Sequence, residues 1–170
     1  MKSPFLFLCH LSVIALFVFS STPLKAQEDP GRTKIGTLDV TVYYATNGDP
    51  AAAGGKREQI SEAIKKSLSA TKELRFAHYR AMGTESKTIF RSYENWAQPL
   101  KPSDEILIRF ETRMEPSKNK VPLNLELWLS RKKILKSDIS LKNGQPLYVL
   151  GPEWRGGRLI IAVELAPKNS

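Results

Sequence analysis

Apolar and polar residues alternate with a period of two along most of the chain after residue 36, which is the pattern of β-strands that place one face on a core. The alternation is most regular where leucine occupies every second position from Leu123 to Leu129, and such regularity fixes the register of a strand. The predicted strands are 36–45, 74–81, 86–94, 106–111, 123–129, 134–141, 147–150 and 158–165.

Turn signals separate these strands. Gly83-Thr84-Glu85 predicts a hairpin turn, Ser130 to Lys133 a basic hairpin, and Asn143-Gly144 a pair that tolerates positive φ. The strands on either side of Asn143-Gly144 are therefore expected to be antiparallel neighbours. Strand 158–165 is apolar on both faces, which favours a central position in a sheet.

One segment has helical spacing instead. Between 56 and 69, apolar or small residues recur every three to four positions beneath a polar face, which predicts an amphipathic helix directly after the first strand. We therefore expect an α+β, β-rich domain: a single antiparallel β-sheet or a sandwich-like domain of about seven to eight strands, with this helix covering part of a sheet.

The N-terminus has the pattern of a secretory signal peptide. Lys2 precedes an apolar run from Phe5 to Phe19, and small residues follow up to Ala26, after which we expect cleavage. The run is about fifteen residues long, which is shorter than the roughly 20 that span a bilayer, so no transmembrane span is expected after cleavage. The expected division is 1–26 signal peptide, 27–35 polar lead-in, 36–166 single β-rich domain and 167–170 polar tail.

This division predicts a secreted or periplasmic protein and limits its chemistry. The signal segment carries Cys9 and His10, and the rest of the chain has no cysteine and a single histidine, His78. Disulfides, thiol nucleophiles and cysteine-ligated metals are thereby excluded from the mature chain, and so is a site that needs two histidines. No metal site and no cofactor are predicted.

The chain is basic, with a formal net charge of +9. Such a field attracts a protein to anionic surfaces, although it equally serves solubility. The densest basic run, Arg131-Lys132-Lys133 with Lys136 beyond it, is too short for a nucleic-acid tract. An envelope protein or an anionic polysaccharide is the expected partner, with no specific nucleic acid; the sequence does not define the oligomeric state.

Three sets of residues are candidates for chemistry. Gly54-Gly55-Lys56 lies where a phosphate-binding loop would, but Pro50 and Arg57 replace the glycine and the hydroxyl residue that such a loop needs, so an ordinary loop is favoured. His78 has no Gly-x-Ser-x-Gly segment to accompany it. The carboxylates of Asp104 and Glu105, or of Glu94 and Glu126, remain an alternative acid and base pair for hydrolysis.

The tryptophans are the remaining candidates. Trp96 precedes a proline-flanked loop, and Trp128 lies on the polar face of its strand, where burial by another layer is favoured. Trp154 lies in a glycine-rich turn with Arg155 and Arg158, where it fits either a plug at the end of the core or a contact for a partner. Trp154, Arg155 and Arg158 are the predicted binding residues.

These observations favour a non-enzymatic secreted or periplasmic β-domain that binds another cell-envelope or extracellular component. The first alternative is a small carboxylate- or His-dependent hydrolase, which requires those groups to converge in a concave pocket. The second is a structural or assembly subunit of an envelope complex, for which an unpaired edge strand or a large apolar patch would be the indication.

Overall fold

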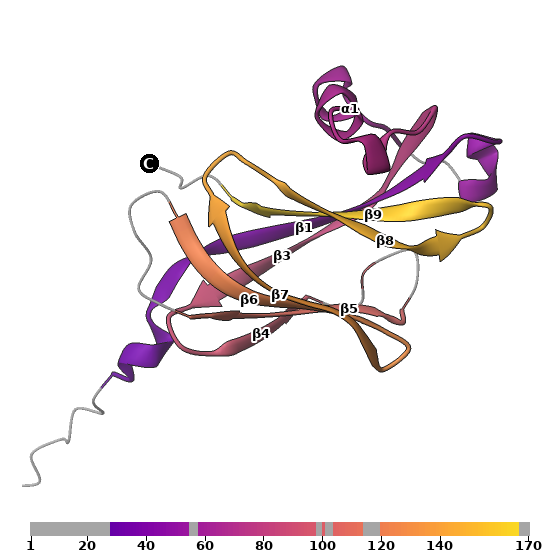
Figure 1. Cartoon of the computed structure of the whole chain (residues 1–170). Helices are drawn as coiled ribbons and strands as arrows, with labels where there is room; N and C mark the ends of the chain where they lie inside the picture. The colour runs from indigo at the N-terminus through magenta and orange to yellow at the C-terminus, as the bar shows by residue number, and fades with distance from the viewer. Residues whose placement is uncertain (1–27, 55–57, 98–99, 101–103, 114–119, 167–170) are drawn as a thin grey trace, which may run out of the picture.

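The computed structural model describes residues 28–54, 58–97, 100, 104–113 and 120–166, and these form two antiparallel β-sheets (Figure 1). The five-stranded sheet has the order β2-β3-β1-β9-β8, and the four-stranded sheet has the order β4-β5-β6-β7. The strands are β1 (Lys34–Thr46), β2 (Glu58–Gln59), β3 (His78–Phe90), β4 (Glu94–Ala97), β5 (Ile106–Thr112), β6 (Lys120–Leu129), β7 (Lys132–Lys142), β8 (Leu147–Trp154) and β9 (Gly157–Leu165). The helices are α1 (Glu62–Ser69) and three short 3₁₀ helices, η1 (Pro30–Arg32), η2 (Pro50–Ala53) and η3 (Lys72–Leu74). The predicted β-rich fold with one amphipathic helix is confirmed.

The two sheets face each other across a shared apolar core. Alternate residues of β1 and β9, such as Val40 and Ile161, point inward and meet Ile108 and Phe110 of β5 and Leu125 of β6, all with at most 1% of their surface exposed. Each such side chain contributes about 1.5–3 kcal/mol by leaving water. This core explains the regular alternation, because every second residue of these strands lies in it.

Part of the outer face of the five-stranded sheet is covered by α1 and η3 (Figure 1). Leu68 of α1 is fully buried against the β1 and β9 residues Tyr43 and Ile160. The helix is shorter than the predicted 56–69: the Ser61 side chain caps it by accepting a hydrogen bond from the Ile64 amide, and Glu58–Gln59 pair with β3 as β2. Residues 56 and 57 lie outside the described residues.

The predicted hairpin turn at Gly83-Thr84-Glu85 is wrong. β3 runs through these residues as one strand that pairs with β1 from end to end. The pairing shifts by one residue between Val42 and Tyr43, because Val42 lies opposite Gly83 while Tyr43 lies opposite Ala81. Gly83 therefore marks an irregularity within a strand rather than its end.

The expected pairing of 134–141 with 147–150 is also wrong. β7 belongs to the four-stranded sheet and β8 to the five-stranded sheet, so the chain crosses from one layer to the other at Asn143-Gly144. Only Lys142 and Gln145 form an isolated bridge at this turn, and Leu147 already pairs with Val163 of β9. Both β7 and β8 are consequently edge strands.

The last strand is flanked on both sides, as its apolar pattern predicts. β9 pairs with β1 and with β8, so it lies within the five-stranded sheet.

Part of the expected lead-in 27–35 belongs to structured elements, because η1 begins at Pro30 and β1 at Lys34. The expected signal peptide and polar tail lie outside the described residues. Among the helices described, none has the length and hydropathy of a membrane span.

Candidate functional site

The predicted binding residues lie at the tip of the β8–β9 hairpin. Arg155 and Gly156 form its two-residue turn with φ angles of 46° and 72°, which match the twist of antiparallel strands. The end of β1 holds this tip: the Tyr44 hydroxyl donates to the Arg155 carbonyl at 3.0 Å, and Thr46 Oγ1 donates to the Gly156 carbonyl at 3.3 Å. The turn is therefore fixed in position by two hydrogen bonds from a neighbouring strand.

Trp154 closes one end of the core. Its ring packs edge-on against Tyr44, with the ring centroids 5.7 Å apart and an angle of 78° between the planes. The Arg155 guanidinium covers the same indole ring at 4.5 Å from its centroid. Trp154 is only partly buried, so it joins the core to the surface of the hairpin tip.

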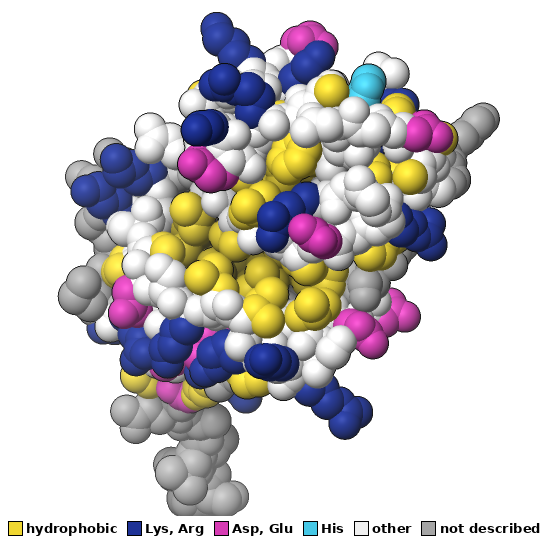
Figure 2. Space-filling view, turned by 45° about the vertical axis from the view of Figure 1, so that its right-hand side comes forward, with side chains coloured by type: hydrophobic (Ala, Val, Ile, Leu, Met, Phe, Trp, Pro, Cys, Tyr) yellow, Lys and Arg dark blue, Asp and Glu magenta, His cyan; other side chains and the backbone are white. Residues whose placement is uncertain are grey.

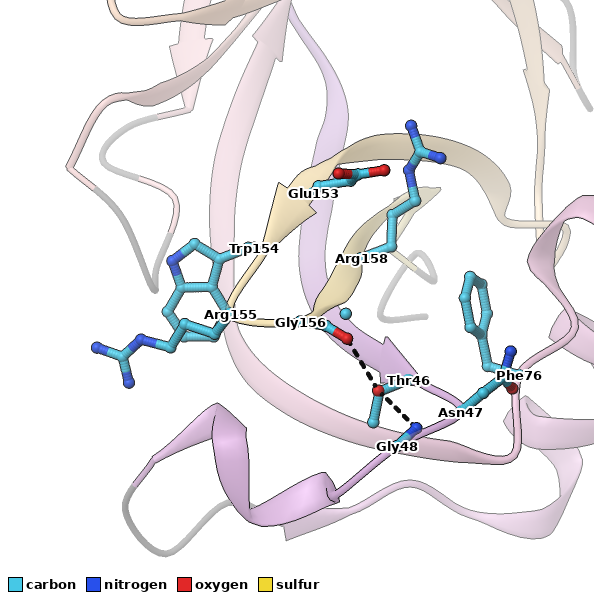
Figure 3. A pocket seen from close by; sticks show the side chains of 10 residues that line it. Thr46, Asn47, Gly48, Phe76, Glu153, Trp154, Arg155, Gly156 and Arg158 are labelled. Carbon is cyan, nitrogen blue, oxygen red and sulfur yellow. Dashed lines mark hydrogen bonds between the residues drawn. The ribbon is translucent and has the colours of Figure 1, made fainter.

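Arg158 lies on the other side of the sheet from Trp154. Its cross-strand partner is Glu153, and its Nε donates to the Gly151 carbonyl at 3.1 Å. A hollow of about 580 Å³ opens beside it, with Phe76 on the opposite wall (Figure 3). All three predicted residues line this hollow, but the side chains of Trp154 and Arg155 point away from those of Arg158 and Phe76 (Figure 3). The lining of this hollow combines the Arg158 guanidinium, the Glu153 carboxylate and the Phe76 ring.

Glu126, one of the carboxylates considered for catalysis, lies beneath three cations on the outer face of the four-stranded sheet. Its carboxylate lies 2.9 Å from Lys133 Nζ, 3.3 Å from Lys136 Nζ and 3.4 Å from Arg109, while its side chain is 3% exposed. The Lys133 hydrogen bond, with smaller contributions from Lys136, the Trp128 indole N–H and Arg109, lowers the pKa of Glu126 to about 2 against the opposing effect of burial. A carboxylate held ionised in this way is unsuited to donate a proton near neutral pH.

Trp128 belongs to this charged cluster. Its Nε1 donates to Glu126 Oε2 at 3.1 Å, and Lys133 Nζ lies 5.1 Å from the centroid of its ring. The expected cover over Trp128 is therefore a lysine side chain from the adjacent strand rather than another layer of secondary structure. The side chains of Glu94 and Trp96 lie outside the described part of the structure.

The other groups considered for catalysis are His78, Asp104 and Glu105. His78 is exposed at the start of β3, where it lines a small hollow of about 150 Å³ with Glu62 and Lys65. Asp104 is exposed, and Glu105 accepts a hydrogen bond from Ser130 Oγ at 2.6 Å. Within the described ranges, no three His, Cys, Asp or Glu side chains are grouped so as to hold a metal ion.

A second site was missed by the sequence reasoning: an apolar groove of about 390 Å³ between the two edge strands β7 and β8. Ile134 and Leu150 are among the most exposed large apolar residues of the described chain, at 44% and 37%. Figure 2 shows hydrophobic side chains gathered across this face, with lysines and arginines along the lower margin. The residues that line the groove are Leu125, Leu127, Ile134, Leu135, Ser137, Ile139, Leu147, Tyr148, Val149 and Leu150.

The sequence did contain a signal for this groove. Leu147 to Leu150 is an uninterrupted apolar run, and Ile134 breaks the alternation of β7. A strand with one buried face can bury only every second side chain. Both features therefore indicate that some apolar side chains of these strands lie at the surface. Comparisons of the chain with family models, with curated proteins and with solved structures found no match, so the geometry of these two sites is the basis for assigning a function.

Proposed function

We propose that this chain is a secreted or periplasmic, non-enzymatic β-domain, sandwich-like in architecture, that binds another protein of the cell envelope. The observation that carries the proposal is the apolar groove between β7 and β8. Proteins seldom leave a hollowed apolar surface beside two edge strands unless another chain covers it. The basic net charge favours encounter with an anionic partner.

The non-enzymatic part of the proposal is supported by the state of the titratable groups. Glu126 is held ionised by its cations, and His78, which lies opposite Thr46 of β1, lines a separate hollow with Glu62 and Lys65. Acid–base catalysis requires two groups within hydrogen-bond reach of one substrate. Of the carboxylates considered for that role, Asp104, Glu105 and Glu126 do not line the hollow of His78.

The test is affinity capture of the tagged full-length chain from its own envelope, compared with groove variants. Ile134→Glu and Leu150→Glu place charge at residues that line the groove and are already partly exposed, so we expect both variants to fold. Ala63→Glu, on the exposed side of α1, is the matched control. We expect the native chain and the control to retain a stoichiometric partner at moderate salt, and both groove variants to lose it.

The same capture separates the groove from the hairpin tip. Arg158→Ala removes the guanidinium from the hollow beside Phe76 without altering the groove. Loss of the partner with Arg158→Ala alone would assign the contact to the tip, as the sequence predicts. Retention of one partner by every variant would contradict the proposal.

The second candidate, a structural subunit of an envelope assembly, is favoured by the same open edge. The two candidates differ in how the chain is recovered from the envelope. A structural subunit would be recovered only in a complex, whereas a binding domain would also be recovered free. Size-exclusion chromatography of the native envelope extract distinguishes the two.

A further inference from the structure

We propose that the groove binds an extended, acidic and apolar segment of a partner protein, which pairs with β7 as an additional strand of the four-stranded sheet. This inference rests on the proposed function and specifies its partner. It follows from three properties of the groove: the edge that β7 offers, the side chains that face inward, and the charges beside them.

β7 offers the longer and more regular edge. It runs for 11 residues, and its pairing with β6 is regular from Leu135 to Lys142. β8 has 8 residues, its pairing is irregular between Leu150 and Glu153, and Pro152 within it has no N–H to donate. Of the two edges, β7 therefore provides the continuous row of backbone donors and acceptors that strand addition uses.

The inward row of β7 has a gap in its middle. Leu135 and Ile139 point into the groove, while Ser137 between them has a small side chain. The residues facing this row across the groove are Leu147 and Val149 of β8. A strand beside β7 would place every second side chain here, so its inward positions must be apolar, and the space at Ser137 favours a large one.

The outward row of β7 is basic. The strand carries four lysines and one aspartate. Lys133 and Lys136 both contact the single carboxylate oxygen Glu126 Oε1, and Lys136 remains 52% exposed. Acidic side chains on the outward face of an added strand would therefore lie beside unneutralised positive charge, with a neutral or basic residue preferred next to Asp138.

The same charges argue against a second copy of this chain as the occupant. Symmetric pairing of two β7 strands would bring lysine rows together, which is unfavourable. An acyl chain would use the apolar lining but leave the backbone groups of β7 without partners. A peptide strand uses the lining, the backbone edge and the lysines together.

The experiment uses three synthetic peptides of about ten residues, a length that matches β7. The first alternates large apolar residues with glutamate, the second replaces glutamate with lysine, and the third has the composition of the first with the alternation scrambled. Binding to the full-length chain is measured by calorimetry, and the paired strand is identified by hydrogen exchange of backbone amides. We expect the acidic alternating peptide to bind at least about tenfold more tightly than the other two, with protection confined to β7 amides.

Charge reversal and backbone blocking provide the controls. Lys136→Glu should weaken binding of the acidic peptide and strengthen that of the lysine peptide, and Lys142→Glu repeats the test without disturbing the ion pairs of Glu126. Only every second amide of an added strand faces β7. N-methylation of that set of peptide amides should abolish binding, and N-methylation of the other set should not. Equal binding of all three peptides, protection of β8 instead of β7, binding of anionic lipid vesicles alone, or a dimer in sedimentation experiments would each overturn the inference.

The outcomes also separate this inference from the proposed function. If Ile134→Glu and Leu150→Glu abolish capture of the envelope partner but no peptide binds, the groove is a protein contact of another kind. If the groove variants leave capture unchanged, the proposed function fails as well.

Discussion

The ring of Tyr44 lies directly against the backbone of Gly157. A Cβ atom at residue 157 would come within 2.5 Å of the Tyr44 Cε2 atom and within 2.6 Å of the Ala45 carbonyl oxygen. This approach allows the Tyr44 hydroxyl to reach the Arg155 carbonyl and the ring to meet Trp154. The hairpin tip and the end of β1 are thus packed with no space for a side chain between them.

Gly157→Ala should therefore destabilise the protein. The added methyl group meets a backbone oxygen that cannot move aside, so the expected loss in the free energy of unfolding is about 1–3 kcal/mol. Chemical denaturation measures it. Gly36→Ala is the control, because a Cβ atom there has nothing within 4 Å and should change stability little. Similar effects of the two substitutions would show that the close packing at Tyr44 is unimportant.

Trp154→Ala should lower the free energy of unfolding and should leave any contact made by Arg158 intact. The substitution removes the ring that packs on Tyr44, and because Trp154 is only partly buried we expect a loss of about 2–3 kcal/mol. Arg158→Ala, whose side chain lies on the other side of the sheet, should leave the denaturation midpoint nearly unchanged. A stable Trp154→Ala variant that no longer binds its partner would instead assign Trp154 to the contact.

Glu126 should make stability depend on pH in the acid range. Its pKa is lowered to about 2 in the folded protein from an ordinary value of 4.5, so the folded state favours the ionised form. The resulting stabilisation is present above pH 4.5 and is lost as the pH falls towards 2. Glu126→Gln should reduce stability at pH 7 and flatten this dependence, as measured by denaturation midpoints across the range. Parallel pH profiles for the two proteins would contradict the assignment.

Leu68→Ala should loosen α1 from the sheet. Leu68 is fully buried and provides the deepest contact of the helix with Tyr43 and Ile160, so truncation should cost roughly 2–4 kcal/mol. Hydrogen exchange should rise in residues 62–69 more than in β9. Lys65→Ala, on the exposed side of the same helix, is the control and should leave exchange in β9 unaltered.

The alternation in the sequence predicted β1, β5 and β6 well because it reflects local burial. Val40, Ile108 and Leu125 all lie in the shared core, and each strand kept the register that its pattern indicates. The pattern does not state which strand lies beside which. Asn143-Gly144 has the composition of a hairpin turn, yet the backbone pairing of Leu147 with Val163 draws β8 into the other sheet.

The sites were predictable to different extents. Trp154, Arg155 and Arg158 do line one hollow, but their neighbour Phe76 comes from a segment 78 positions before Trp154 and gave no signal of its own. The groove depends on the separation of β7 from β8, so it could not be found while those strands were expected to pair. The cations around Glu126 come from β5 and β7, and only the sheet brings them together.

The position of β1 between β3 and β9 has a consequence for how the chain folds. Leu38 pairs with Lys87 on one side and with Leu165 on the other, so the five-stranded sheet is incomplete until the last strand arrives. Contacts between residues so distant in sequence close slowly, on the order of milliseconds to seconds in β-rich domains. An emerging chain therefore stays open until β9 is released, and the apolar faces of β1 and β3 remain uncovered during that interval.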